Sequence, residues 1–276
     1  MLTGDVHKDD YSGEYVLKDY VGECTRKYGA LDEHTLSGQR IYGLFLRLLG
    51  RLEEAKVLLL AAQRGSRATL GLRHSLTLAL MSNLASLLHD QGKLNEAEAL
   101  YIEALEACRA TQGPLHLNTS TCMSNLASLL HTQGKLDEAK LLMLEALEVK
   151  RATLGPKHPE TLNSINNLAL LLLNQGQLGE AKPLMLEVLQ ARRATLGPMH
   201  PCTLISMNNL ASLLKAQGRL GEAGALARDT FAGRRSVLGD AHPDTQNTHV
   251  LLLLLLMAQG KHREARELKA AFTHGK

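Results

Sequence analysis

The sequence predicts an all-α fold, a solenoid of helix-turn-helix repeats, from two regular features. The first is a pattern that returns every 42 residues without insertion or deletion, a period typical of solenoids. The second is a pair of apolar stripes at helical spacing inside each repeat. A glycine followed by a Glu-Ala pair marks the period: Gly50, Gly92, Gly134, Gly176, Gly218 and Gly260.

Residues 156–197 illustrate the predicted repeat. Leu162, Ile165 and Leu168 form the apolar stripe of its first helix. A Gln-Gly turn separates the two helices, and a second loop glycine then ends the repeat in the left-handed conformation common at helix C-termini. The His-Pro pair that opens several first helices places proline in the first turn, where its missing N–H costs nothing.

The repeat register predicts the domain organisation. Residues 1–29 are expected to hold the leading helix of a partial or degenerate repeat, and residues 274–276 form a tail. The first and last full repeats diverge from the others, as expected of capping repeats. The six tandem repeats span 30–71, 72–113, 114–155, 156–197, 198–239 and 240–273.

Small residues at two fixed places carry a family resemblance. One alanine lies in the first helix of the regular repeats and another, such as Ala139, in each second helix, so that the paired helices can approach closely. With the strings NNLALLLLNQGQLGEAKPLMLEVL and LGPxHP, this pattern resembles the tetratricopeptide repeat in its 42-residue form, the form found in kinesin light chain-like and nephrocystin-like proteins. The resemblance covers roughly residues 30 to 273. It implies a right-handed α-solenoid that binds peptides or proteins on its concave face.

Composition narrows the function classes. A net charge of +3, with the basic residues spread by the repeat, gives no indication of nucleic-acid binding. No signal peptide and no apolar run of bilayer length are found, so a cytoplasmic protein without membrane insertion is expected. The cysteines show no CxxC spacing and are expected to be reduced, structural thiols: Cys24, Cys108, Cys122 and Cys202.

No motif indicates catalysis. The sequence has no phosphate loop, HExxH or GxSxG element, so we expect no enzyme, no cofactor and no metal site. One histidine recurs per repeat, and such equivalent positions cannot converge on one ion, so a structural role at the helix start is predicted for His74, His116, His158, His200 and His242. The recurring arginines are predicted to be helix C-terminal charges that complement the helix dipole: Arg67, Arg109, Arg151, Arg193 and Arg235.

The first helices of the repeats provide the candidate binding residues. In tetratricopeptide arrays these helices line the concave surface, and positions i, i+4 and i+7 share a helix face. The resulting strip is basic at its N-terminal end, polar in the middle, partly apolar in the fourth and sixth repeats, and free of acidic residues. The predicted peptide-binding residues are Arg40, Arg47, His89, His131, Asn166, Leu170, Leu173, Asn208, Ser212 and Lys215.

Asparagines adjacent to this strip have two interpretations. In the kinesin light chain family, asparagines of the first helices contact the backbone of an extended peptide, and the Asn166-Asn167 and Asn208-Asn209 pairs resemble them. An amide offers both a donor and an acceptor for this purpose. Alternatively, the second asparagine of each pair bonds between helices and is structural. Both interpretations stay open for Asn83, Asn125, Asn167 and Asn209.

The leading functional hypothesis is a non-enzymatic scaffold or adaptor that binds an extended, acidic peptide segment with an apolar or aromatic anchor. The alternative concerns the C-terminal end, where residues 250–258 are strongly apolar. These leucines either pack between neighbouring helices or form a surface for self-association or assembly.

Overall fold

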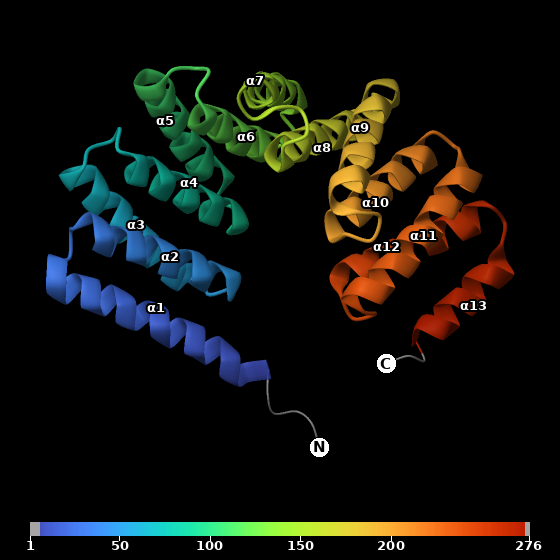
Figure 1. Ribbon diagram of the computed structural model, residues 1–276, viewed down its shortest axis with the longest axis horizontal. Helices are drawn as coiled ribbons and strands as arrows, with labels where there is room; N and C mark the ends of the chain where they lie inside the picture. The colour runs from blue at the N-terminus through green and yellow to red at the C-terminus, as the bar shows by residue number, and fades with distance from the viewer. Residues whose placement is uncertain (1–5, 274–276) are drawn as a thin grey trace. The chain divides into compact units, whose positions relative to one another are not determined.

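The computed structural model describes residues 6–273, and the side chains of residues 13–272, as an all-helical fold without strands (Figure 1). The predicted tail at 274–276 and the first residues of the leading segment lie outside the described residues. The helices are α1 Val6–Tyr28, α2 Glu33–Leu48, α3 Leu52–Thr69, α4 Ser75–Asp90, α5 Leu94–Gln112, α6 Leu117–Thr132, α7 Leu136–Leu154, α8 Pro159–Asn174, α9 Leu178–Leu196, α10 Pro201–Ala216, α11 Leu220–Leu238, α12 Pro243–Ala258 and α13 His262–Thr273.

The helix pairs coincide with the 42-residue register. Each repeat holds a first helix, with an even number, and a second helix, with an odd number. Gly134 in the turn between α6 and α7 has φ 79°, and Gly155 after α7 has φ 89°. Both values lie in the left-handed region that favours glycine, which explains why glycine marks the turn inside the repeat and the loop at its end.

Histidine caps the first helix of five repeats, as the sequence predicts. The ring Nδ1 of His158 accepts a hydrogen bond from the backbone N–H of Glu160 at 3.2 Å. The same contact is made by His74, His116, His200 and His242. Asp32 takes this place before α2, where its carboxylate accepts from the N–H of His34. The histidines thus perform the usual role of a side-chain acceptor at an N-cap.

The small residues let the paired helices pack closely. Ala169 in α8 and Ala181 in α9 are completely buried, as are their counterparts in the neighbouring regular repeats. In the first full repeat Gly43 replaces the alanine, because a Cβ there would lie 2.7 Å from the side chain of Leu59. Leucine and methionine make up most of the remaining core, in keeping with the scarcity of aromatic residues.

The chain divides into two compact units, residues 1–149 and 150–276, with the division inside α7. In the first unit, α1 packs on α2, and α2, α4 and α6 lie side by side (Figure 1). In the second unit, α8, α10 and α12 lie side by side in the same way. We call the surface formed by these even-numbered helices in each unit the first-helix face.

Second helices are joined by ion pairs across repeats. Arg67 contacts Glu103, and Arg151 contacts Glu187 at 2.9 Å. Arg109 contacts Glu145 in the same way. These three arginines therefore do more than complement a helix dipole, because they also link α3 to α5, α5 to α7 and α7 to α9. No helix within residues 6–273 is long and apolar enough to span a bilayer.

Candidate functional site

The predicted peptide-binding residues all lie on the first-helix face, and none of them is fully buried. In the first unit these are Arg40 and Arg47 on α2, His89 on α4 and His131 on α6. In the second unit α8 contributes Asn166, Leu170 and Leu173, whereas α10 contributes Asn208, Ser212 and Lys215. The face is therefore open to a ligand along the helices of each unit.

The two arginines of α2 differ in whether their Nε atoms have an acceptor. Arg47 donates from Nε to the carboxylate of Asp90 at 2.5 Å. The predicted strip itself contains no acidic residue, but the end of α4 brings Asp90, the residue after His89, against Arg47 on the neighbouring helix. By contrast, the Nε of Arg40 is buried and finds no acceptor among the described residues. Arg40 is the cation with hydrogen-bonding capacity to spare.

Polar side chains join adjacent first helices in the first unit. The ring of His89 contacts the hydroxyl of Thr132 on α6 at 3.2 Å. Arg47 and Asp90 make the equivalent contact one repeat earlier, since each pair is separated by 43 residues. These contacts hold one edge of the face together and orient the side chains there.

A groove of about 370 Å³ lies between α4 and α6. Serine, threonine and asparagine side chains lie beside apolar surface along its walls. The Nδ2 of Asn83 is buried without an acceptor among the described residues. Two thiols belong to its lining. The lining residues are Ser75, Leu78, Ala79, Ser82, Asn83, Cys108, Asn118, Thr121, Cys122 and Asn125. This groove can supply several amide and hydroxyl groups to an extended chain.

Asparagines connect the first helices of the second unit. Asn209 donates from Nδ2 to Oδ1 of Asn166 at 2.9 Å, which links α10 to α8. The hydroxyl of Thr248 donates to Oδ1 of Asn208 at 3.2 Å, which links α12 to α10. Asn166 and Asn208 thus each accept one hydrogen bond from a neighbouring first helix through Oδ1. Their amide N–H groups remain for other partners. Asn167 is exposed.

Buried cations in the second unit are the feature that the sequence analysis missed. Lys150 is 7% exposed and donates to the hydroxyl of Ser164, although its neighbour Arg151 is exposed. Desolvation by burial lowers the pKa of Lys150 below its ordinary value. The same position holds Arg192 in α9 and Arg234 in α11, and both are buried.

Arg192 shows how this position is accommodated. Its guanidinium donates to Ser206 Oγ at 2.8 Å, to the carbonyl of Cys202 at 3.1 Å and to Asn163 Oδ1 at 2.6 Å. Burial lowers the pKa of Arg192 and of Arg234. The sequence does contain a signal for these buried cations. In three repeats, a lysine or arginine at this position is followed fourteen residues later by serine or threonine.

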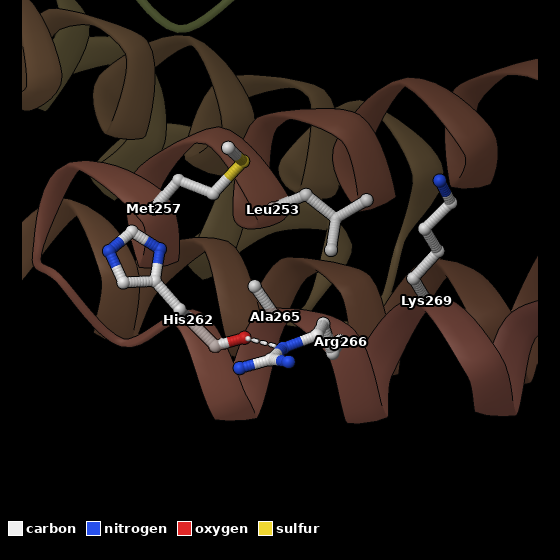
Figure 2. A pocket seen from close by; sticks show the side chains of 6 residues that line it. All are labelled: Leu253, Met257, His262, Ala265, Arg266 and Lys269. Carbon is white, nitrogen blue, oxygen red and sulfur yellow. Dashed lines mark hydrogen bonds between the residues drawn. The ribbon is translucent and has the colours of Figure 1, made fainter.

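A second hollow, of about 360 Å³, lies between α12 and α13 (Figure 2). Leu253 and Met257 of α12 face His262, Ala265 and Arg266 of α13 across it. Of the predicted apolar run, Leu252, Leu255 and Leu256 are buried, which fits packing between helices. Val250, Leu254 and Met257 are about half exposed.

In the part of the chain that the structure describes, no group of three or more His, Cys, Asp or Glu residues could hold a metal ion.

These helix pairs, their turn glycines and their small packing residues define a helical repeat protein of the solenoid class. The tetratricopeptide repeat profile matches residues 34–101, 76–152 and 160–236, which is well over half of the chain. The chain therefore belongs to the tetratricopeptide repeat family. Comparison with curated proteins gives no match.

Solved structures place the repeats among those of kinesin light chain-like proteins. A Podosopora anserina protein described as a kinesin light chain with nearly identical TPR-like repeats is 27% identical, with a TM-score of 0.65. The alignment covers 74% of this chain and 96% of that one. BtubC (BKLC) from P. vanneervenii shares the fold, with 20% identity, a TM-score of 0.61 and coverage of 93% and 92%. The pilF protein of Pseudomonas aeruginosa also shares it, with 19% identity, a TM-score of 0.58 and coverage of 86% and 88%. Repeats of this family and type support a protein-interaction scaffold.

Proposed function

We propose that the first-helix face binds an extended, acidic peptide segment of a protein partner, and that this function is non-enzymatic. The observation that supports the proposal is the set of polar side chains that stay partly exposed along this face. They include Arg40, Asn166 and Asn208, and the two asparagines use only their Oδ1 atoms in the contacts to neighbouring helices. A ligand that supplies carbonyl or carboxylate oxygens can therefore accept hydrogen bonds from these side chains, each of which contributes about 0.5–1.5 kcal/mol.

The asparagines suit the backbone of such a peptide. Asn166 and Asn208 each accept a hydrogen bond from a neighbouring first helix, so their side chains are held in place before a ligand arrives. Their amide donors can then meet peptide carbonyls without reading the side chains of the ligand. Such preorganisation lowers the entropy that binding would otherwise cost.

Charge and apolar surface give the ligand its expected chemistry. Arg40 and Lys215 offer cationic groups on the face of each unit, and acidic ligand residues would be attracted to them. Leu170 and Leu173 on α8 are partly exposed and could seat an apolar or aromatic side chain. An acidic segment with one such anchor therefore complements the face best.

Fluorescence polarisation against a small set of acidic, aromatic-containing peptides tests the proposal. We expect saturable binding that weakens as salt is raised from about 50 to 150 mM, because screening reduces the attraction between charges. Arg40→Glu should weaken binding by about tenfold and Arg47→Glu by less, since Asp90 already neutralises Arg47.

The matched control is Arg64→Glu, which makes the same charge change at an exposed position on the second helix α3. Equal losses from Arg40→Glu and Arg64→Glu would contradict the assignment of the face.

A second candidate function is self-association through the C-terminal end, with a second copy of this chain as the partner. The half-exposed Val250, Leu254 and Met257 and the adjoining hollow between α12 and α13 favour it. Light scattering should then show a mass that rises with concentration and returns to that of a single chain in the Leu251→Lys, Leu254→Lys variant. A mass independent of concentration would exclude this candidate.

A further inference from the structure

Two buried thiols meet where successive repeats of the first unit join. The sulfur of Cys108 on α5 lies 3.1 Å from the sulfur of Cys122 on α6, and the two thiols share a hydrogen bond. Cys108 is 1% exposed and Cys122 is 5% exposed. Both line the floor of the groove between α4 and α6. Their spacing of fourteen residues matches no redox or metal motif, so only the fold brings them together.

We propose that Cys108 and Cys122 form a redox-active dithiol, which a hydroperoxide converts into an intramolecular disulfide that joins α5 to α6. The sulfur atoms need to approach by about 1 Å to reach the length of a disulfide bond, roughly 2.05 Å. Both cysteines line the groove of about 370 Å³, and a small oxidant fits beside them there, because a molecule the size of water occupies only about 30 Å³.

The shared hydrogen bond prepares one thiol for the first step. It lowers the pKa of Cys108 below its usual value, whereas the same bond and burial raise the pKa of Cys122. One sulfur of the pair is therefore more readily ionised than a free thiol, and its neighbour stays protonated. Because the thiolate is the reactive form, the attack on the oxidant is assigned to Cys108.

The reaction balances with the hydroperoxide as the only oxidant. The Cys108 thiolate attacks one peroxide oxygen, the O–O bond breaks, and Cys108 becomes a sulfenic acid while water or an alcohol leaves. The sulfur of Cys122 then attacks the sulfenic sulfur, loses its proton, and expels the hydroxyl group as water. Two thiols are oxidised to one disulfide, and one peroxide is reduced.

Neighbouring repeats show which variants keep the fold. The position of Cys108 is taken by Ser66 in the preceding repeat, where its hydroxyl bonds Thr77. The position of Cys122 is taken by Ser164 and Ser206 in later repeats. Serine is therefore accommodated at both sites, and Cys108→Ser and Cys122→Ser are the variants of choice.

The test is oxidation of the full chain with a few equivalents of hydrogen peroxide, followed by alkylation and intact mass measurement. We expect two of the four thiols to be lost to alkylation, a mass about 2 Da lower before alkylation, and a cross-linked peptide pair that contains residues 108 and 122. Dithiothreitol should restore all four thiols. The Cys24→Ser, Cys202→Ser variant should behave like the unaltered chain.

Three results would overturn the proposal. One is that the Cys122→Ser variant loses two thiols as fast as the unaltered chain does. Another is a cross-link that involves Cys24 or Cys202 in place of this pair. The third is oxidation of Cys108 beyond the sulfenic acid without formation of a disulfide in the unaltered chain. A thermal midpoint that rises by several degrees on oxidation, and falls again on reduction, would further support a bond between the two repeats.

Discussion

One side-chain position decides whether the space between two first helices is open or filled. Cys108 occupies it in the first unit, beside the groove between α4 and α6. Arg192 occupies it in the second unit and contacts Asn163, Cys202 and Ser206. Those three residues stand, in order, at the repeat positions of the groove-lining residues Ala79, Asn118 and Cys122. A long cation thus takes the space that a short thiol leaves open.

Lys150→Met tests the cost of burying a cation at this position. We expect the free energy of unfolding to rise by about 1 kcal/mol at pH 7, because an apolar chain of similar length avoids desolvating a charge. The pKa of Lys150 is lowered in the folded chain, so the penalty is present below that folded pKa and is relieved as the pH rises toward the unfolded value near 10.5.

Urea denaturation at pH 7 and pH 10 should therefore show a gain for Lys150→Met that shrinks at the higher pH. The exposed loop residue Lys157 provides the control, since Lys157→Met should change stability by less than about 0.5 kcal/mol. A loss of more than 1 kcal/mol for Lys150→Met at pH 7 would show that its hydrogen bonds outweigh its desolvation.

At the scale of the helix, histidine serves as the N-cap because Nδ1 reaches the N–H two residues ahead. His158→Ala removes the acceptor for Glu160 and should lower the free energy of unfolding by about 1 kcal/mol. His158→Asp should lose less, because Asp32 makes the same contact before α2. Urea denaturation at pH 7 compares the variants, and equal losses for alanine and aspartate would contradict the capping role.

The sequence predicts the helix pairs well because their determinants are local. The signals that define a helix pair act within a few residues: a turn glycine such as Gly134, a capping histidine and the helical spacing of apolar residues. Each of these signals also recurs in several repeats. The side-chain contacts between repeats are harder to predict from the sequence. The pairing of Arg47 with Asp90 and the bond from Asn209 to Asn166 depend on how far one first helix is offset from the next. The repeat pattern alone does not give that offset.

Across the whole chain, stability in a repeat array is carried mainly by contacts between neighbouring elements. Ala169→Leu places a large side chain in the closely packed interior between α8 and its neighbours, and should cost about 1–3 kcal/mol. The effect should be local. Hydrogen exchange should accelerate most in α8, α9 and α10 and least in α2 and α3.

The control for this prediction is Ala152→Leu, at an exposed position on α7, which should leave exchange nearly unchanged. If Ala169→Leu instead accelerated exchange equally in both units, the chain would unfold as one cooperative body and the local account would be wrong.

The central claim is that amides on the first-helix face grip the backbone of an acidic peptide. The most direct measurement is the dissociation constant of one bound peptide for the Asn166→Ala, Asn208→Ala variant, beside a variant with Asn95→Ala and Gln190→Ala at exposed positions on second helices. The account predicts at least about tenfold weaker binding for the first variant and no change for the second. Equal affinities for the two variants, both folded by circular dichroism, would contradict it.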